Sequence, residues 1–61
     1  MNSVYILMEY TNDAGWVMGN IIGVFGSEEK ARVRKEELEM DENSLYMQRE
    51  YWLEIEKYLV R

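Results

Sequence analysis

Residues 23–31, GVFGSEEKA, mark the point where an apolar stretch ends and a helix begins. Gly26 closes the apolar stretch, and Ser27 is a favoured N-cap residue because its hydroxyl accepts a hydrogen bond from a free first-turn N–H. Glu28 and Glu29 follow in the first turn, where the helix dipole stabilises negative charge. The stretch therefore predicts a helix over residues 28–40, which are mostly strong helix formers.

The same glycines and serine also resemble the start of a phosphate-binding loop. Such a loop presents unpaired N–H groups to an anion, whereas here two carboxylates come directly after the serine. The sequence also lacks a G-x-x-x-x-G-K-[ST] pattern. We therefore interpret residues 23–31 as a strand-to-helix junction.

The residues before this junction predict a β-hairpin. Residues 3–11, SVYILMEYT, are rich in β-branched and aromatic side chains, which favour a strand. Asn12, Asp13 and Gly15 supply turn chemistry, and residues 16–25 return as a second strand. Gly19 and Gly23 interrupt this second strand and indicate a bulge or a close backbone approach.

The residues after the helix are harder to assign. Residues 40–44 read as a connector, and residues 45–50, LYMQRE, are ambiguous between a short helical turn and irregular structure. Residues 51–60, YWLEIEKYLV, alternate in polarity and favour a third strand. A helix that folds over the sheet is the alternative, since Trp52, Ile55 and Leu59 also follow helical spacing.

These elements predict an α+β fold of ββαβ order, an antiparallel three-stranded sheet with one helix packed on one face, in a single domain over residues 1–61. One helix covers only one face of a sheet. We expect Val4, Ile6 and Met8 to face the helix, which leaves the other face apolar and open. An open apolar face favours self-association as a homodimer. The expected dimer-interface residues are Tyr5, Leu7, Trp52 and Tyr58 from the sheet, with Val33 and Met40 from the outer side of the helix.

The composition supports self-association. The chain has 61 residues and is 48% hydrophobic, but it contains no Cys and no His. A domain of this size usually needs disulfides, a metal or oligomerisation to be stable, and only oligomerisation is left here. The chain has no signal-like or membrane-spanning stretch, so we expect a cytoplasmic protein.

The residue types argue against an enzyme. Nucleophilic catalysis needs a base beside the nucleophile, and the chain has neither His nor Cys. Ser3, Ser27 and Ser44 all stand at expected element boundaries. No cofactor or metal is expected, although Glu36 and Glu39 share a helix face on which a divalent cation would fit.

An acidic cluster is the candidate partner-binding site. Five acids stand within residues 36–42, namely Glu36, Glu37, Glu39, Asp41 and Glu42. They lie near the expected helix C-terminus, where the dipole disfavours negative charge. A solvated helix end is the simpler interpretation, and a surface that meets a basic partner is the functional one.

The basic stretch KARVRK, residues 30–35, suggests nucleic-acid binding beside an aromatic platform of Tyr5, Trp52 and Tyr58. The net charge of −5 opposes this interpretation, because acids on both sides of the stretch repel phosphates. Pairing within the helix, for example between Glu28 and Arg32, is the structural alternative.

The stretches VYILMEY, IIGVFGSEEKA and YWLEIEKYLV resemble a family of small uncharacterised phage and bacterial domains with a strand–strand–helix–strand plan. The likeness covers most of the chain, whereas the acidic connector and LYMQRE depart from the family pattern. The resemblance implies the ββαβ plan and a phage or mobile-element origin, and it supplies no catalytic residues.

Together these features predict a small non-enzymatic protein of a phage or mobile element that binds and inhibits a host protein in the host cytoplasm. The acidic surface would imitate nucleic acid toward a basic target, such as a nucleic-acid-acting defence component. The alternative is a structural or regulatory subunit of a larger assembly without inhibitory activity.

Overall fold

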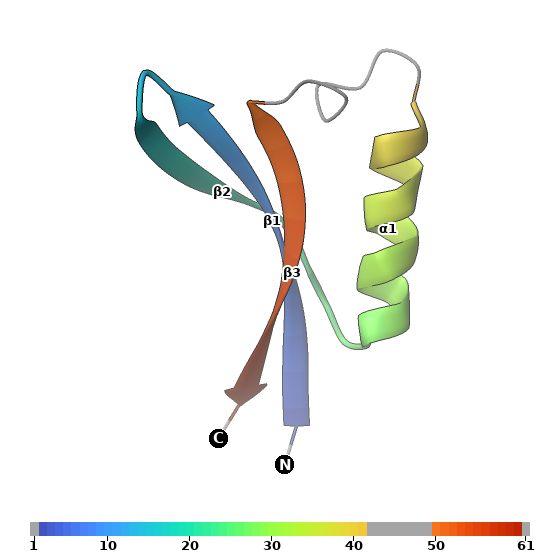
Figure 1. The fold of residues 1–61 in the computed structure, drawn as a ribbon. Coiled ribbons are helices and arrows are strands. Elements are labelled where there is room, and N and C mark those ends of the chain that lie inside the picture. The colour runs from blue at the N-terminus through green and yellow to red at the C-terminus, as the bar shows by residue number, and fades with distance from the viewer. Residues whose placement is uncertain (1, 42–49, 61) are drawn as a thin grey trace.

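The structure is a computed structural model that describes residues 2–41 and 50–60. It contains β1 (Asn2–Asp13), β2 (Trp16–Phe25), α1 (Glu28–Met40) and β3 (Tyr51–Val60). The strands form one sheet in the order β2-β1-β3, and β1 pairs antiparallel with both neighbours. The helix lies against one face of this sheet (Figure 1). The predicted α+β fold with an antiparallel three-stranded sheet is therefore confirmed.

The strand-to-helix junction has the predicted geometry. Ser27 has an extended backbone, and its Oγ accepts a hydrogen bond from the Lys30 backbone N–H at 3.2 Å. The helix covers residues 28–40, as its sequence predicts. Residues 51–60 form a strand, so the helical alternative for that segment is wrong. Most of the ambiguous segment 45–50 lies outside the described residues.

The hairpin turn is shorter than the sequence suggests. Asn12 and Asp13 belong to β1, and Asp13 pairs with Trp16, so only Ala14 and Gly15 form the turn. Their φ angles are 52° and 87°. Positive φ at both central residues is the signature of a type I′ turn, whose twist matches that of the two strands it joins. The expectation of a longer turn that includes Asn12 and Asp13 is wrong.

The two glycines of β2 mark a bulge and a close contact with a side chain. Ile22 is the extra residue of a bulge, because the register moves from Leu7↔Gly23 to Met8↔Ile21. Gly19 sits under the ring of Tyr10, where an added Cβ would lie 2.9 Å from the Tyr10 Cε1 atom. Of the two alternatives predicted for these glycines, the bulge is confirmed beside Gly23. At Gly19 the close approach is made by the Tyr10 side chain.

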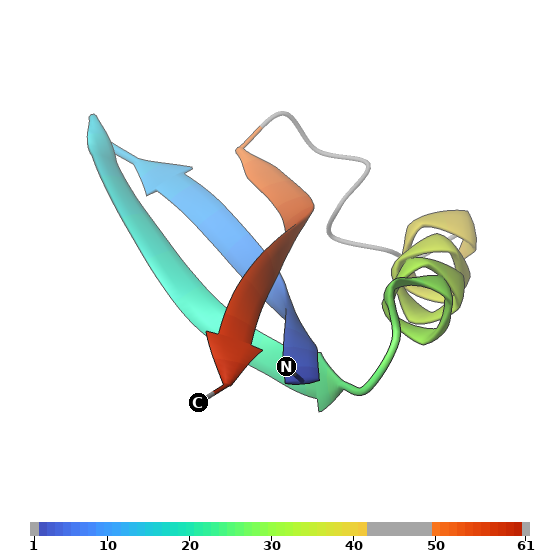
Figure 2. The ribbon, with the colours of Figure 1, turned by 90° about the horizontal axis from the view of Figure 1, so that it is seen from below.

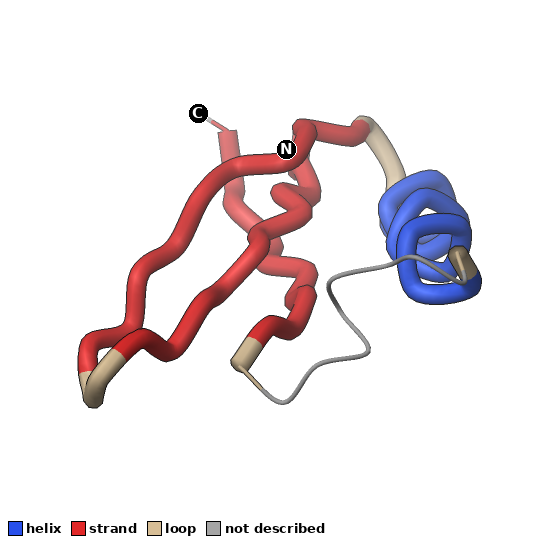
Figure 3. The backbone as a smooth tube through the Cα atoms, turned by 90° about the horizontal axis from the view of Figure 1, so that it is seen from above, coloured by secondary structure: helices blue, strands red, loops and turns tan. Residues whose placement is uncertain are grey.

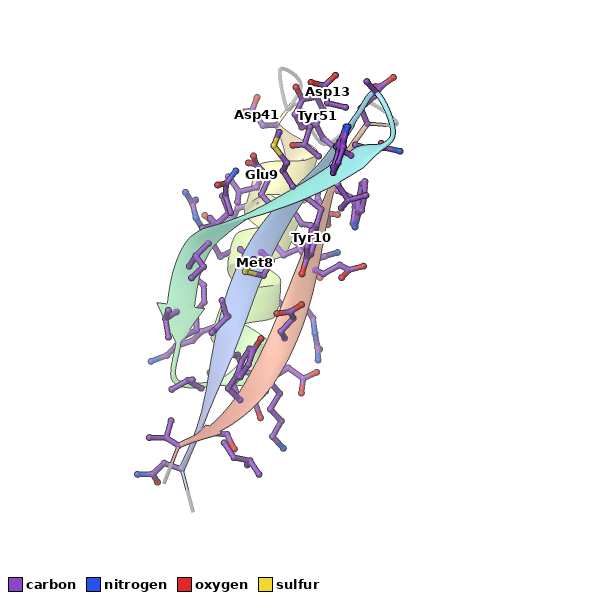
Figure 4. All side chains as sticks on the ribbon, turned by 90° about the vertical axis from the view of Figure 1, so that its left-hand side faces the viewer. Met8, Glu9, Tyr10, Asp13, Asp41 and Tyr51 are labelled. Carbon is purple, nitrogen blue, oxygen red and sulfur yellow. The ribbon has the colours of Figure 1, made fainter. Side chains whose placement is uncertain are left out.

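The face of β1 that the helix covers is opposite to the one expected. Leu7 is 0% exposed, as is Ala31 on the helix, so the odd-numbered residues of β1 face α1. Met8 and Tyr10 lie on the face away from the helix (Figure 4). The assignment of Val4, Ile6 and Met8 to the helix side is therefore wrong. It failed because β1 is apolar on both sides, which leaves polarity alternation unable to identify the buried side.

The core is small and the molecule is extended. Among the described residues, only Leu7, Ala31 and Leu53 are buried hydrophobics. The accessible surface is 4955 Å², against about 4,200 Å² expected for a folded 7.4 kDa chain. The radius of gyration is 12.5 Å, against roughly 10.5 Å for a compact domain of this length. Much apolar surface therefore stays in contact with solvent.

The β1–β2 hairpin accounts for much of this extension. Its turn projects to one side of the molecule while α1 lies at the other side (Figure 2). The view from above shows the same separation between the hairpin turn and the helix (Figure 3). Most of β2 is consequently exposed on both of its faces.

Within residues 2–41 and 50–60, no helix has the length and apolar content needed to cross a membrane.

Candidate functional site

The sheet face away from the helix, called the open face below, draws residues from all three strands. Strand alternation and the register place on it the even-numbered residues of β1 and β3. The same register adds three apolar residues of β2. Its members are Val4, Ile6, Met8, Tyr10, Val17, Ile21, Val24, Trp52, Glu54, Glu56 and Tyr58.

An aromatic stack forms the centre of the open face. Tyr10 and Trp52 are paired across β1 and β3, and their rings stack with centroids 5.7 Å apart and an interplanar angle of 21°. On the other side, the Tyr10 ring covers Gly19 of β2. The missing side chain at Gly19 gives the ring room to lie against the sheet. The stack is therefore held in one orientation by both neighbouring strands.

Glu56 ties this stack to a second tyrosine. The Tyr10 hydroxyl donates a hydrogen bond to Glu56 Oε1 at 2.6 Å, and the Tyr58 hydroxyl donates to Glu56 Oε2 at 3.0 Å. The hydrogen bond to Glu56, then desolvation and the nearby negative charge, raise the pKa of Tyr10 to about 12. The same carboxylate raises the pKa of Tyr58. Both phenols therefore keep the proton that they donate to Glu56 up to a higher pH than a free tyrosine does.

Exposed aliphatic side chains flank the network on its β2 side. Ile21 and Val24 of β2 are both more than half exposed, and Tyr58 is 50% exposed. Aromatic rings with hydrogen-bonding ends, set among exposed aliphatic side chains, are characteristic of protein–protein interfaces. The open face therefore has the composition of a protein-binding surface.

The acidic cluster is partly neutralised by the helix itself. Glu37 pairs with Arg34 at 3.4 Å, and Glu39 pairs with Lys35 at 3.1 Å. Glu36 and Asp41 are also exposed, whereas Glu42 lies outside the described residues. Within the part of the chain that the structure describes, no cluster of three or more acidic side chains is arranged to hold a metal ion.

Cations of the basic stretch, residues 30–35, likewise pair with acids of the same helix. Glu28 pairs with Arg32 at 3.2 Å, which confirms the pairing predicted within the helix. Lys30 and Arg34 line a groove of about 540 Å³ between α1 and the end of β2, but Glu29 and Glu37 line it too. The groove therefore carries no net basic charge that would attract a phosphate.

The residues predicted for a dimer interface do not form one surface. Trp52 and Tyr58 lie on the open face, but Leu7 is buried and Tyr5 shares its side of β1, facing the helix. The placement of Tyr5 and Leu7 on the open side is therefore wrong, because β1 is apolar on both sides and its polarity does not identify the buried one. Tyr5 accordingly cannot join Trp52 and Tyr58 in an aromatic platform.

The helix residues of that set occupy another part of the molecule. Val33 and Met40 are exposed, as the helical spacing predicts, while Ala31 is buried against the sheet. They belong to α1, which lies on the opposite side of the sheet from the open face. A single partner surface cannot include both groups without wrapping around the sheet.

Sequence reasoning missed Tyr10 and Glu56, the two residues that organise the open face. The sequence assigns both residues to strands, but the contact between them depends on β1 being the central strand. The two lie 46 positions apart, and the hydrogen bond between them runs from β1 to β3. A small residue opposite an aromatic one, Gly19 facing Tyr10, is the signal that would have indicated the close packing.

The chain matches no protein-family model, and comparisons with curated proteins and with solved structures find no match.

Proposed function

We propose that this chain is a non-enzymatic protein that acts by binding another protein through the open face of its sheet. The observation that carries the proposal is the Tyr10–Trp52 stack, which is fixed by Gly19 and Glu56 and flanked on its β2 side by exposed aliphatic side chains. Rigid Tyr and Trp side chains dominate binding energy at protein interfaces. An aromatic pair already held in place loses little conformational entropy on binding.

A protein partner suits the open face better than a nucleic acid. Glu54 and Glu56 lie on this face and would repel a phosphate backbone. The four cations of residues 30–35 belong to α1, on the other side of the sheet. A nucleic acid would therefore have to stack its bases on one side of the molecule and bind its phosphates to cations on the opposite side.

We extend the proposal to the biological role expected from the sequence, that of a phage or mobile-element protein that inhibits a host protein in the host cytoplasm. Mimicry of nucleic acid by the acidic cluster has weaker support, because Glu37 and Glu39 are paired with cations of the same helix. A subunit role in a larger assembly is the alternative. Reversing Glu36 and Asp41 to lysine tests the mimicry, and unchanged activity in a phage-infection assay would exclude it.

The test of the open face is a comparison of matched surface variants. The tagged chain is produced in its source cell, and a partner that co-purifies is identified and prepared pure. Binding to that partner is then measured by calorimetry for the wild type, for Trp52→Ala with Tyr58→Ala, and for Glu29→Ala with Val33→Ala on the helix. We expect the open-face variant to lose at least tenfold in affinity and the helix variant to bind as the wild type does.

Two results would refute the proposed binding surface. Equal affinity of the open-face variant and the wild type would place the contact elsewhere on the molecule. A larger loss for the helix variant would place it on α1. Circular dichroism of each variant establishes that the fold is retained before binding is compared.

A further inference from the structure

The outer edge of β2 is the feature of this molecule that the proposed function leaves unexplained. β2 is an edge strand, since the sheet order is β2-β1-β3. Its ten residues, WVMGNIIGVF, contain no charged residue and no proline. Soluble proteins normally protect such an edge with lysine, proline or a covering segment, because its free N–H and C=O groups can pair with another strand.

The other edge of the sheet is protected in the usual way. β3 carries Glu54, Glu56 and Lys57, and charged side chains on an edge strand disfavour pairing with a second chain. The two edges of one small sheet thus differ sharply in character. This contrast singles out β2 as the edge at which pairing is permitted.

We infer that β2 pairs with β2 of a second copy, antiparallel and about a two-fold axis, to form a continuous six-stranded sheet. The pairing segment is Trp16–Ile21, because the bulge at Ile22 interrupts the regular backbone beyond it. The tight turn at Ala14 and Gly15 lets the free edge begin at Trp16. The inference is independent of the proposed binding role of the open face.

A second copy is the occupant that fits an uncharged, apolar edge. The chain carries a net charge of −5, so two copies repel each other wherever their charged surfaces meet, and β2 is an uncharged region. β2 also offers six large apolar side chains that are 38–77% exposed. These are Trp16, Val17, Met18, Ile21, Ile22 and Val24.

The available surface is sufficient for a dimer. Four of these side chains, Trp16, Val17, Met18 and Ile21, lie in the pairing segment. At roughly 100 Å² each, covering them in two copies buries about 800 Å² of side-chain surface, and the paired backbones add further area, which is the size of a small, reversible interface. Antiparallel pairing over six residues adds about six backbone hydrogen bonds, within the usual number for an interface. Among the described residues, these β2 side chains remain exposed in a single copy.

The symmetry of this dimer has a defined consequence. A two-fold axis that relates antiparallel neighbouring strands runs perpendicular to the sheet, so both helices lie on the same side. The two open faces then join into one surface on the other side. The Tyr10–Trp52 stacks would appear twice on that surface, related by the same axis.

Spin-label distances between the two copies test the pairing directly. The chain has no native Cys, so single cysteines at Val17, Met18, Asn20 and Ile21 give one label per copy. For antiparallel pairing, the distance between equivalent labels rises by roughly 6.6 Å for each residue away from the axis. We expect a minimum within residues 17–20 and a rise on both sides. A label at Leu59 on β3, five strand spacings from its equivalent, should lie beyond about 24 Å.

Light scattering on a size-exclusion column supplies the second measurement. We expect a dimer of twice the 7.4 kDa chain mass, converted to a monomer by Met18→Lys with Ile21→Lys. Leu59→Lys, at a residue of β3 that is 62% exposed, is the matched control and should remain dimeric. A wild-type monomer at all concentrations, including one that binds only a strand of another protein, would overturn the inference. A dimer whose label distances are constant along β2, or whose shortest distance is at Leu59, would overturn it equally.

Discussion

Three Leu→Ala substitutions on the helix-facing side of the sheet provide the sharpest test of the fold. Leu7 is 0% exposed at the centre of β1, Leu53 is 5% exposed on β3, and Leu59 is 62% exposed further along β3. The chemical change is identical at all three positions. Any difference between the three variants therefore reports how well α1 covers each leucine.

The expected magnitudes follow from burial. Leu→Ala at a fully buried site costs about 3–5 kcal/mol, because the lost transfer free energy is increased by the cavity that remains. We expect Leu7→Ala and Leu53→Ala to lose about 3 kcal/mol each, and Leu59→Ala to lose less than about 1 kcal/mol, since most of its side chain stays in water. A single core of this size supplies only about 3–5 kcal/mol in total. Leu7→Ala is accordingly expected to retain no more than about 2 kcal/mol of stability.

Urea denaturation followed by tryptophan fluorescence measures these differences. All variants are compared at one protein concentration, because self-association would make the apparent stability depend on concentration. An equal loss of stability in Leu7→Ala and Leu59→Ala would refute the burial of Leu7 beneath the helix. A larger loss of stability for an open-face change such as Ile6→Ala than for Leu7→Ala would show that the helix covers the face of Val4, Ile6 and Met8 instead.

Three further predictions concern the hairpin and the open face. Ala14→Asn should stabilise the protein by about 0.5–1 kcal/mol in urea denaturation, because asparagine tolerates the positive φ of a type I′ turn better than alanine does; unchanged stability would contradict the turn assignment. Gly19→Ala should destabilise the protein and weaken the near-UV circular dichroism of the aromatic stack, because its Cβ would meet the Tyr10 ring at 2.9 Å; a near-UV spectrum identical to that of the wild type would show that the ring does not cover this residue. Glu56→Gln should lower the pKa of Tyr10 from about 12 toward 10 in an NMR titration of the tyrosine ring carbons, since the carboxylate is its main cause; an unshifted pKa would contradict the hydrogen bond. Because the folded-state pKa of Tyr10 is raised, its contribution to stability is complete below pH 10 and is lost as the pH rises toward 12.

Local patterns predicted the elements of this fold with few errors. The helix over residues 28–40 was evident from Ser27 and the two acids after it, because capping depends on neighbours in sequence. The alternation in residues 51–60 indicated β3 for the same reason. Asn12 and Asp13 misled the turn prediction, since they are good turn residues that here continue β1 up to a two-residue turn.

The arrangement of the open face was not predictable from such patterns. β1 is apolar on both sides, so its sequence does not say which side the helix covers. The hydrogen bond between Tyr10 and Glu56 depends on the sheet order and the pairing register, which bring together residues 46 positions apart. The sequence correctly indicated that an apolar sheet face would remain open, but it assigned Tyr5 and Leu7 to the wrong side.

The central position of β1 bears on how the chain folds. One edge of β1 pairs with β2, its neighbour in sequence. The other edge pairs with β3, whose residues lie 40–58 positions further along the chain. During synthesis, β3 emerges after the other three elements, and a two-stranded hairpin alone is only marginally stable in water. The nascent hairpin therefore exposes both edges of a two-stranded sheet, and we expect the closure of the long loop between β1 and β3 to limit the folding rate. Pairing of β3 with β1 therefore completes the sheet and also covers the β1 edge through which an incomplete chain could aggregate.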